Sequence, residues 1–344
     1  MFMDDGGKTL GNAISGKAGT AARLCGALLI SAGALAGGAL AAPAAQAGTA
    51  ARLDDCPESG TQQRDGLRRD HEGHLTSEEA AAYDRELREE LRDQQGPGAA
   101  QQIDVTVPVA VHIVHAEDGT GNVSNGTVRE QIAVLDEAFG GGLAGADTGF
   151  GFDLAETTRT ANNAWFSDFA EHEEEIKDRL RQGGAETLNL YITDLGEGVL
   201  GQAAFPQEYS SDPGNDGVVM SYRTVPGGSQ QDFDRGYTAV HETGHWLGLF
   251  HTFQNGCTDP GDYVDDTPYE AEQASGCPEG RDTCPDRRGD DPVTNFMDYS
   301  DDACMDSFTA GQARRMADHW TAFRGEQAQG ARESRAPAVP LLRH

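Results

Sequence analysis

Hydrophobic residues occupy every second position from Ile103 to Ile113. This alternation predicts a β-strand with one face turned to a core. Apolar residues at helical spacing, followed by three glycines, predict a helix from Thr127 to Phe139. Strands that alternate with helices predict a mixed sheet of the α/β (α+β) class. The other predicted strands are 150–154, 188–192, 200–205 and 218–222, and a charged helix is predicted at 173–181.

The segment before the first strand is polar and carries one helix signal. Thr76 and Glu79 form a capping-box pattern at the start of a predicted helix that covers 78–92. A Gly-Pro-Gly sequence then indicates a linker. We interpret residues 48–102 as a pro-segment or flexible arm, and residues 325–344 as a disordered tail.

The amino terminus has the pattern of a secretory signal peptide. Lys8, Lys17 and Arg23 precede an apolar run at 24–42, and a small-x-small sequence ends at Ala47. The alternative is a transmembrane anchor, but the run barely reaches the roughly 20 apolar residues that spanning requires. No second apolar stretch follows. We therefore predict a signal peptide at 1–47 and a secreted chain without membrane insertion.

Composition limits the function classes that remain. The 344-residue chain has a formal net charge of −31, which argues against a nucleic-acid partner, because phosphate binding needs clustered Lys and Arg. The chain has few large aliphatic residues, so we expect a small hydrophobic core. Cross-links or bound metals would add stability to such a core.

Cysteines in an exported chain are expected to form disulfides. Four of them lie close together near the carboxyl end, so we expect two disulfides there, and three pairings are open. The four clustered cysteines are Cys257, Cys277, Cys284 and Cys304, and Cys56 lies outside this cluster.

The strongest chemical motif lies in a helix predicted to begin near Gly236. His241 and His245 are four residues apart, so both imidazoles lie on one helix face, and Glu242 follows the first of them. Gly248 allows a sharp turn that would bring His251 to the same ion. Three ligands and one open position are the catalytic arrangement of zinc. The other histidines, including His319, are interpreted as surface or strand residues.

A second motif, Asn-Phe-Met-Asp-Tyr, lies downstream and contains Met297 and Tyr299. The long histidine motif followed by a methionine-centred turn resembles the metzincin zinc endopeptidases. The stretches 241–253, 261–268, 295–305 and 308–316 resemble the pappalysin family more narrowly. The resemblance covers roughly residues 103–323 and is weak in the first strands.

The resemblance implies a metzincin-like catalytic domain at 103–324, with a mixed twisted sheet and an active-site helix in 103–251. Residues 252–324 would form an irregular, disulfide-linked subdomain. By the same resemblance, the three histidines bind zinc and Glu242 is general base and acid. Met297 would form the floor beneath the metal, and Tyr299 would stabilise the oxyanion. The implied disulfides are Cys257–Cys284 and Cys277–Cys304.

Two further sites are predicted outside the zinc motif. Asp262, Asp265 and Thr267 place hard oxygen donors in one short loop, which suits Ca²⁺. The resemblance to the family agrees, while the alternative is an ordinary solvated acidic surface. Cys56 would occupy the fourth zinc position of a latent form, and the alternative is a free or intermolecularly paired thiol.

These observations together predict a secreted zinc endopeptidase that is made as a latent zymogen and acts on protein or peptide substrates. A zinc-activated water would attack the peptide bond. An extended substrate would pair with the predicted edge strand at 200–205. The alternatives are a non-catalytic zinc-containing binding module and a zinc hydrolase for a non-peptide amide. The sequence does not define an oligomeric state.

Overall fold

The computed structural model describes residues 75–94 and 103–325. The predicted signal peptide, Cys56 and the tail after Gly325 lie outside the described residues. No helix in the described ranges is both long and apolar enough to cross a membrane. The elements are α1 (Ser77–Gln94), β1 (Val105–His115), α2 (Asn125–Phe139), β2 (Phe150–Ala161), α3 (Asn163–Ser167), α4 (Phe169–Leu180), β3 (Leu188–Thr193), β4 (Gly201–Ala203), η1 (Pro206–Ser210), η2 (Pro213–Asn215), β5 (Val218–Ser221), α5 (Tyr237–Trp246), α6 (Ala310–His319) and η3 (Trp320–Arg324).

The described strands form one mixed sheet in the order β2-β1-β3-β5-β4. Neighbours from β2 to β5 are parallel, and β4 pairs antiparallel with β5 at one edge. The predicted α/β class is therefore confirmed, and the segment expected at the edge does lie there. The prediction ended β2 at Leu154, but the strand continues to Ala161. Most residues of its second half are solvent-accessible, so that half lacks a hydrophobic alternation.

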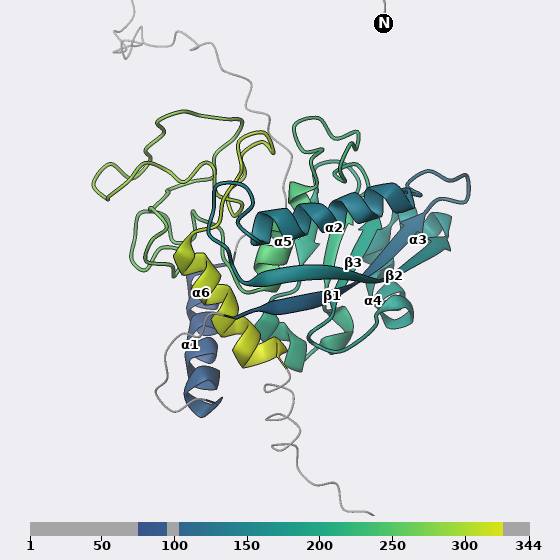
Figure 1. Ribbon diagram of the computed structural model, residues 1–344, viewed down its shortest axis with the longest axis horizontal. Helices are drawn as coiled ribbons and strands as arrows, with labels where there is room; N and C mark the ends of the chain where they lie inside the picture. Colours follow the sequence, from purple (N-terminus) through teal and green to yellow (C-terminus); the bar gives the residue numbers. More distant parts are fainter. Residues whose placement is uncertain (1–74, 95–102, 326–344) are drawn as a thin grey trace, which may run out of the picture. The chain divides into compact units, whose positions relative to one another are not determined.

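Helices cover both faces of the sheet (Figure 1). On one face, α2 and α5 pack against alternate residues of β1 such as Val109 and Val111. On the other face, α3 and α4 bury Trp165, Phe169 and Ile176 against the sheet. Asn162 caps α3 and Ser124 caps α2 through their side-chain oxygens. This sandwich fixes the position of α5, the helix that carries the histidine motif.

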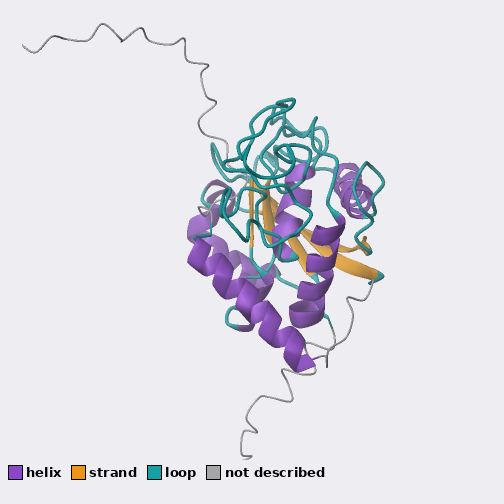
Figure 2. Cartoon of the chain, turned by 90° about the vertical axis from the view of Figure 1, so that its left-hand side faces the viewer, coloured by secondary structure: helices purple, strands orange, loops and turns teal. Residues whose placement is uncertain are grey.

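Residues 247–309 contain turns and coil, with one isolated bridge between Asn295 and Ser307. In Figure 1 this part is light green to yellow-green, and Figure 2 shows loops gathered beyond the end of the strands. Cys257 is joined to Cys284 and Cys277 to Cys304. These are the pairs that the family resemblance implies. The two disulfides cross-link a region that contains little regular secondary structure.

The chain returns to the sheet through α6 and η3, which were not predicted. Arg324 of η3 is fully buried, and its guanidinium pairs with the buried Asp216 at 3.0 Å. Its Nε donates to the Trp246 carbonyl at 2.8 Å, and the guanidinium carbon lies 3.7 Å from the centre of the Trp246 ring. Trp246 Nε1 also donates to Asp216. This buried cluster attaches the last turn of α5 to the sheet.

Replacing the guanidinium should therefore destabilise the whole domain. Arg324→Met leaves the Asp216 carboxylate buried without its cation, which typically costs about 3–5 kcal/mol. Urea unfolding followed by tryptophan fluorescence measures the change. Arg314→Met, at an exposed position of α6, is the matched control and should change the unfolding free energy by less than about 0.5 kcal/mol. Equal stability of the two variants would contradict the assignment.

Candidate metal centre

Helix α5 is buried from its second residue onward and carries the first two histidines of the motif. It begins after Gly236, whose φ of 82° lies in the left-handed region that favours glycine. A Cβ at Gly236 would lie 2.7 Å from the amide oxygen of Gln131, whose Nε2 donates to the Gly236 carbonyl at 2.9 Å. Residues 238–246 are all buried. The helix therefore presents its histidines from a packed, rigid position.

The Nε2 atoms of the three predicted ligands converge on one point. The distance is 3.1 Å from His241 to His245, 3.0 Å from His245 to His251, and 3.3 Å from His241 to His251. All three side chains are buried. Zinc binds imidazole nitrogen at about 2.0–2.1 Å, so nitrogens at this spacing suit one Zn²⁺ with three protein ligands. The structure brings together the ligand set that the motif predicts.

The second nitrogen of each helical ligand contacts a backbone carbonyl. His241 Nδ1 lies 2.7 Å from the Phe296 oxygen, and His245 Nδ1 lies 2.7 Å from the Leu249 oxygen. A carbonyl only accepts, so Nδ1 carries the proton and the Nε2 lone pair faces the common point. His251 is oriented differently, by stacking on Phe253 with ring centres 4.8 Å apart. The donor set therefore matches a metal site before any ion binds.

A turn at Gly248 brings His251 to the other ligands. Gly248 has a φ of 94°, and a Cβ there would collide with the imidazole of His319. Arg315 Nε donates to the Gly248 carbonyl at 3.1 Å. The interpretation of His319 as a surface or strand residue is wrong, because it is buried in α6. Burial and the nearby Arg315 hold the pKa of His319 well below its usual value, so the ring is neutral.

Glu242 follows the first ligand in α5 and is fully buried. Gly201 of β4 lies directly against it, since a Cβ at Gly201 would lie 2.7 Å from Glu242 Cγ and 2.8 Å from Oε1. Any residue larger than glycine at position 201 would displace the Glu242 carboxylate. The edge strand and the predicted base are thus in van der Waals contact.

The methionine turn lies beneath the helix. Met297 is fully buried, and a Cβ at Gly244 would collide with its sulfur. The ring centre of Tyr299 lies 5.7 Å from that of His241 and 5.0 Å from that of His251. Met297 therefore packs against α5, and the ring of Tyr299 lies next to two of the three histidines.

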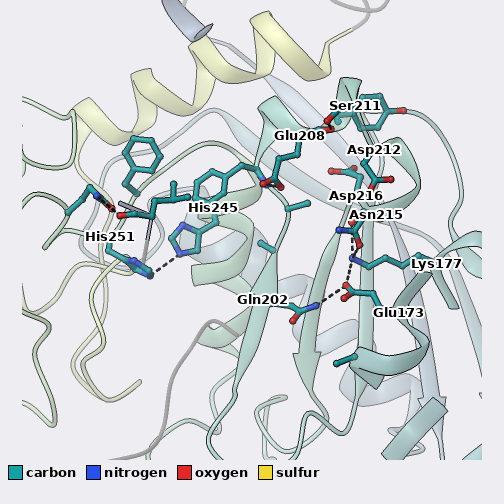
Figure 3. A pocket seen from close by; sticks show the side chains of 18 residues that line it. Glu173, Lys177, Gln202, Glu208, Ser211, Asp212, Asn215, Asp216, His245 and His251 are labelled. Carbon is teal, nitrogen blue, oxygen red and sulfur yellow. Dashed lines mark hydrogen bonds and ion pairs between the residues drawn. The ribbon is translucent and has the colours of Figure 1, made fainter. Parts of the chain in front are cut away.

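A cavity of about 540 Å³ opens beside His245 and His251 (Figure 3). Its wall includes β4, η1 and one side of α4. Lys177 in this wall is almost fully buried, and its Nζ lies 2.6 Å from Glu173 Oε1. The same carboxylate oxygen accepts a hydrogen bond of 2.8 Å from Gln202 Nε2. The cavity thus extends from the metal centre to a polar wall, in which the buried Lys177 forms an ion pair with Glu173.

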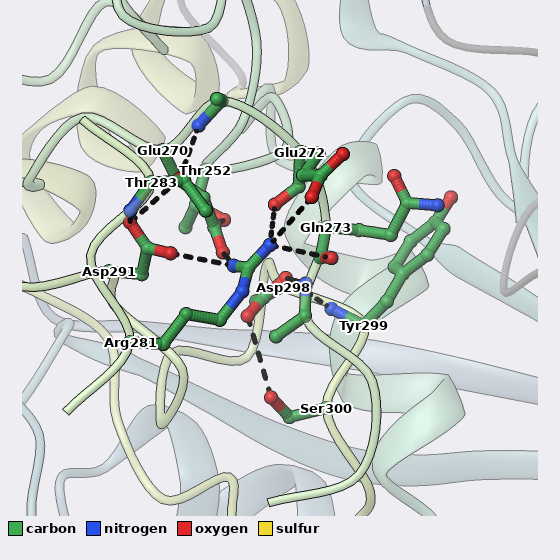
Figure 4. A network of polar contacts seen from close by, with 12 residues as sticks. Thr252, Glu270, Glu272, Gln273, Arg281, Thr283, Asp291, Asp298, Tyr299 and Ser300 are labelled. Atoms are coloured by element: carbon green, nitrogen blue, oxygen red, sulfur yellow. Dashed lines mark hydrogen bonds and ion pairs between the residues drawn. The ribbon is translucent and has the colours of Figure 1, made fainter. Parts of the chain in front are cut away.

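An arginine in the disulfide-linked region organises the loops around the site (Figure 4). Arg281 Nη1 contacts the carboxylates of Glu270 and, at 2.7 Å, Asp291, both of which are fully buried. Glu270 also accepts a hydrogen bond of 2.7 Å from the hydroxyl of Thr252, the residue after the third ligand. Burial and the nearby Asp298 raise the pKa of Glu270. Arg281 therefore supplies the positive charge that this acidic cluster needs.

The methionine turn is attached to the same loops. Asp298 Oδ1 accepts the backbone N–H of Ala274 at 2.9 Å and that of Tyr299 at 2.7 Å. Thr252 N donates to the Met297 carbonyl at 3.2 Å. Both sides of the metal centre are thereby tied to the disulfide-linked loops.

The predicted calcium loop contains buried oxygen atoms without partners. Asp262 Oδ1 accepts the Val264 N–H at 3.0 Å, whereas Asp262 Oδ2 and Thr267 Oγ1 are buried and have no hydrogen-bond partner in the described ranges. Burial raises the pKa of Asp262 to about 8. Asp265 is exposed. Asp262 and Thr267, two of the three predicted donors, therefore have buried oxygen atoms that a bound cation would coordinate.

Sequence reasoning missed several residues that build the site. Arg281 and Arg315 belong to no motif, because their carboxylate and carbonyl partners are distant in the sequence. Gly201 and Gly244 have ordinary backbone angles, and only the packed structure shows that they leave room for Glu242 and Met297. The one available signal was the scarcity of basic residues in an acidic region, which marks Arg281, Arg287 and Arg288 alike as candidate counter-charges.

Comparisons with known proteins agree with this geometry. A family model described as pregnancy-associated plasma protein-A matches residues 173–320. An extracellular metalloprotease of Podospora anserina is 43% identical over 227 residues, which are 64% of this chain and 75% of the relative. A promirolysin mutant from Tannerella forsythia superposes with a TM-score of 0.62 at 26% identity, covering 75% of this chain and 94% of that one. Mature mirolysin of the same organism, in complex with a cleaved peptide, gives 0.57 at 31% identity over 70% and 100% of the two chains.

The metal centre and these likenesses agree on one class: the protein is a zinc metalloendopeptidase with a metzincin-like fold. Within that class, the chain belongs to the pappalysin family. Its curated relatives are named extracellular metalloproteases, and the predicted secretion is confirmed on that ground.

The geometry at Gly248 makes a specific prediction about zinc retention. Gly248→Ala forces a strained φ, which costs about 1–3 kcal/mol, and also pushes the turn away from His319. We expect His251 to move and zinc to be lost on dialysis against a weak chelator, as measured by metal content per chain. Gly227→Ala is the control, since Gly227 has a φ of 72° but no atom within 4 Å of its Cβ position. Wild-type zinc retention by Gly248→Ala would contradict this role.

Proposed function

We propose that Glu242 is the general base and later the general acid of peptide-bond hydrolysis. The observations that support the proposal are that Glu242 is fully buried, that it follows the first of three histidines whose Nε2 atoms converge, and that the edge strand lies against its carboxylate. Zn²⁺ held by His241, His245 and His251 would lower the pKa of a water in the open position to about 7 and polarise a carbonyl. Glu242 takes a proton from the attacking water and returns it to the leaving amine nitrogen.

Tyr299 is proposed to stabilise the negative charge that develops on the substrate carbonyl oxygen. Its ring lies next to two of the ligand imidazoles, which supports this role. A phenolic O–H aimed at developing charge in a largely buried site is worth more than in water. Met297 has no chemical part and supports the metal ligands by packing under α5.

The substrate is proposed to be an extended peptide that pairs with β4. This strand uses one edge to pair with β5, and the sheet ends there within the described ranges. Backbone hydrogen bonds to an edge strand bind any extended sequence, while pockets select side chains. Contact between Gly201 and Glu242 would place the scissile bond beside the base. The structurally similar mature mirolysin forms a complex with a cleaved peptide, which supports a peptide substrate here.

A non-catalytic binding module is less well supported. A site that only holds zinc needs three or four ligands and no adjacent carboxylate base. Glu242 is buried and adjacent in sequence to the ligand His241, and the curated relatives are named metalloproteases.

Removing the base should separate catalysis from metal binding. Glu242→Ala is expected to lower cleavage of unfolded casein by about 10²–10⁴-fold, the usual contribution of a general base, and to leave one zinc per chain. Glu174→Ala, at an exposed position of α4, is the matched control and should retain activity. Full activity of Glu242→Ala would refute the assigned base. Zinc loss in this variant would instead give Glu242 a structural role.

We also propose a structural Ca²⁺ in the loop that contains Asp262, Asp265 and Thr267. Two buried oxygen atoms without partners support it, and Ca²⁺ prefers carboxylate and hydroxyl oxygens. The ion would also remove the destabilising effect of a buried carboxylate.

Stripping calcium should lower the thermal midpoint while zinc remains bound. At a calcium concentration near 100 times Kd, the ion contributes about 2.7 kcal/mol, which corresponds to a fall of several degrees. Calorimetry with a chelator that spares zinc measures it. Asp262→Ala should abolish the difference between chelated and calcium-loaded protein, whereas Asp286→Ala, an exposed control, should keep it. An unchanged midpoint in the chelator would remove the calcium site from the proposal.

Latency is the last part of the proposal. We propose a pro-segment at 48–102 ahead of a catalytic domain at 103–324, divided into 103–251 and 252–324. Cys56, which lies outside the described residues, is proposed as the ligand that blocks the fourth zinc position. Helix α1 packs on the rest of the described chain through the Asp84–Arg315 pair.

A further inference from the structure

The turn that follows α5 controls two of the three predicted zinc ligands. Residues 247 and 248 form the turn, and the chain then continues to His251. The Leu249 carbonyl accepts a hydrogen bond of 2.7 Å from His245 Nδ1. The same short segment therefore orients the second ligand and brings the third ligand to the site.

The peptide unit between Gly248 and Leu249 is held at both of its polar groups. Its N–H, which belongs to Leu249, donates to the Gly244 carbonyl at 2.9 Å. Its carbonyl, which belongs to Gly248, accepts a hydrogen bond of 3.1 Å from Arg315 Nε in α6. Because a peptide unit is planar, two contacts on opposite sides fix its orientation. That orientation sets the direction in which the chain continues to His251.

Arg315 has little freedom to move away from the turn. Its side chain is only 7% exposed, and its Nη1 lies 3.1 Å from the Asp84 carboxylate. The guanidinium carbon lies 4.7 Å from the ring centre of Phe250 and 5.6 Å from that of Tyr263. Phe250 immediately precedes His251. Arg315 therefore contacts both the carbonyl of the turn and the side chain next to the third ligand.

A second residue of α6 packs against the same glycine. His319 lies one helical turn after Arg315, and a Cβ at Gly248 would lie 2.3 Å from its ring. Its Nδ1 lies 2.9 Å from the Arg315 carbonyl and therefore carries the proton. Its Nε2 lies 3.1 Å from Gln207 Nε2 and accepts a hydrogen bond from it. The ring is thus fixed as a wall on one side of the turn, while Arg315 holds the carbonyl.

The two polar contacts of the Arg315 side chain use different nitrogen atoms. The Asp84 carboxylate accepts from Nη1, at the far end of the side chain. The Gly248 carbonyl accepts from Nε, which is bonded to Cδ. The ion pair and the contact with the turn are therefore separable by substitution.

We propose that Arg315 is a positioning residue of the metal centre. Its Nε hydrogen bond to Gly248 holds the turn, and the turn places His245 and His251 for one Zn²⁺. Partners that orient metal ligands typically contribute about 10–100-fold to metal affinity. The inference rests on the proposed zinc ligands, and it adds that metal affinity depends on a side chain of α6, a helix outside the histidine motif.

Two double variants of the full chain isolate this hydrogen bond. Both carry Asp84→Asn, so that no buried carboxylate is left without its cation. One adds Arg315→Gln and the other adds Arg315→Met. Glutamine has its amide nitrogen bonded to Cδ, as arginine has Nε, so it is able to donate to the Gly248 carbonyl. Methionine is of similar size but offers no N–H.

Zinc dissociation constants are measured by competition with a chelator of known affinity, without substrate. The Arg315→Gln double variant should bind zinc within about threefold of the unaltered chain, whereas the Arg315→Met double variant should bind it at least about tenfold more weakly. The visible absorption of Co²⁺ loaded in place of zinc gives a second readout. It should fall in the Arg315→Met double variant, because a site that loses its third histidine gains water ligands and six-coordinate Co²⁺ absorbs weakly.

Arg315→Lys in the otherwise unaltered chain provides a milder variant. It keeps a cation for Asp84 but places a methylene group where Nε stands, so zinc should again bind at least about tenfold more weakly. Ile176→Ala is the control for lost stability, since Ile176 is fully buried in the cluster on the other face of the sheet. It should unfold at lower urea concentration but keep the zinc affinity of the unaltered chain. Urea unfolding of every variant verifies that it is folded.

Equal zinc affinity of the two double variants, or of Arg315→Lys and the unaltered chain, would overturn the proposal. Weak zinc binding by Ile176→Ala would do the same, because affinity would then follow overall stability. An unaltered chain that binds no zinc would overturn the proposed ligand set together with this inference. Dependence of zinc affinity on position 315 in a chain that cleaves no peptide would support the inference and count only against the proposed catalysis.

Discussion

The structure depends on holding three imidazoles with their Nε2 atoms about 3 Å apart in a buried site. Nitrogen lone pairs that are directed at one point repel one another, so the surrounding structure must hold the rings in these orientations. Two carbonyl contacts and one left-handed glycine do so. Gly248 and the Leu249 carbonyl belong to the turn after α5, whereas the Phe296 carbonyl comes from the methionine turn. The centre therefore depends on tertiary contacts and not on one element alone.

The carbonyl contacts connect the metal centre to the two halves of the domain. The Phe296 carbonyl belongs to the methionine turn, which Asp298 ties to the disulfide-linked loops. The other side of the centre is held by Arg315 through the Gly248 carbonyl. Loops that lack regular secondary structure are therefore positioned by a few buried charges. The sandwich around the sheet, in contrast, is held by apolar packing.

The sequence predicted those features that depend on local spacing. Alternation located β1, β3 and β5, and the histidine motif named the three histidines that the structure brings together. Glycines after Phe139 marked the end of α2 correctly. Helix α6 was missed because its polar residues Gln312 and Arg315 are buried by distant partners, so its apolar stripe is narrow. The later half of β2 was missed because few of its side chains are buried.

Features that depend on distant packing could not be predicted from the chain alone. No local pattern distinguishes Arg281, which balances two buried carboxylates, from the neighbouring Arg288 at the surface. The same holds for Gly201, whose importance lies in the absence of a side chain beside Glu242. The resemblance to a family implied the disulfide pairs, which the number and spacing of cysteines left open.

The shortness of β4 has a consequence for what the enzyme is able to cut. The strand contains only three residues, from Gly201 to Ala203, so an annealed peptide gains few backbone hydrogen bonds from it. With the proposed pairing, a target protein would need to expose only a brief extended stretch, such as a surface loop or a chain end, and would not need to unfold globally. Regular helices and paired strands would resist, because their backbone groups are already occupied.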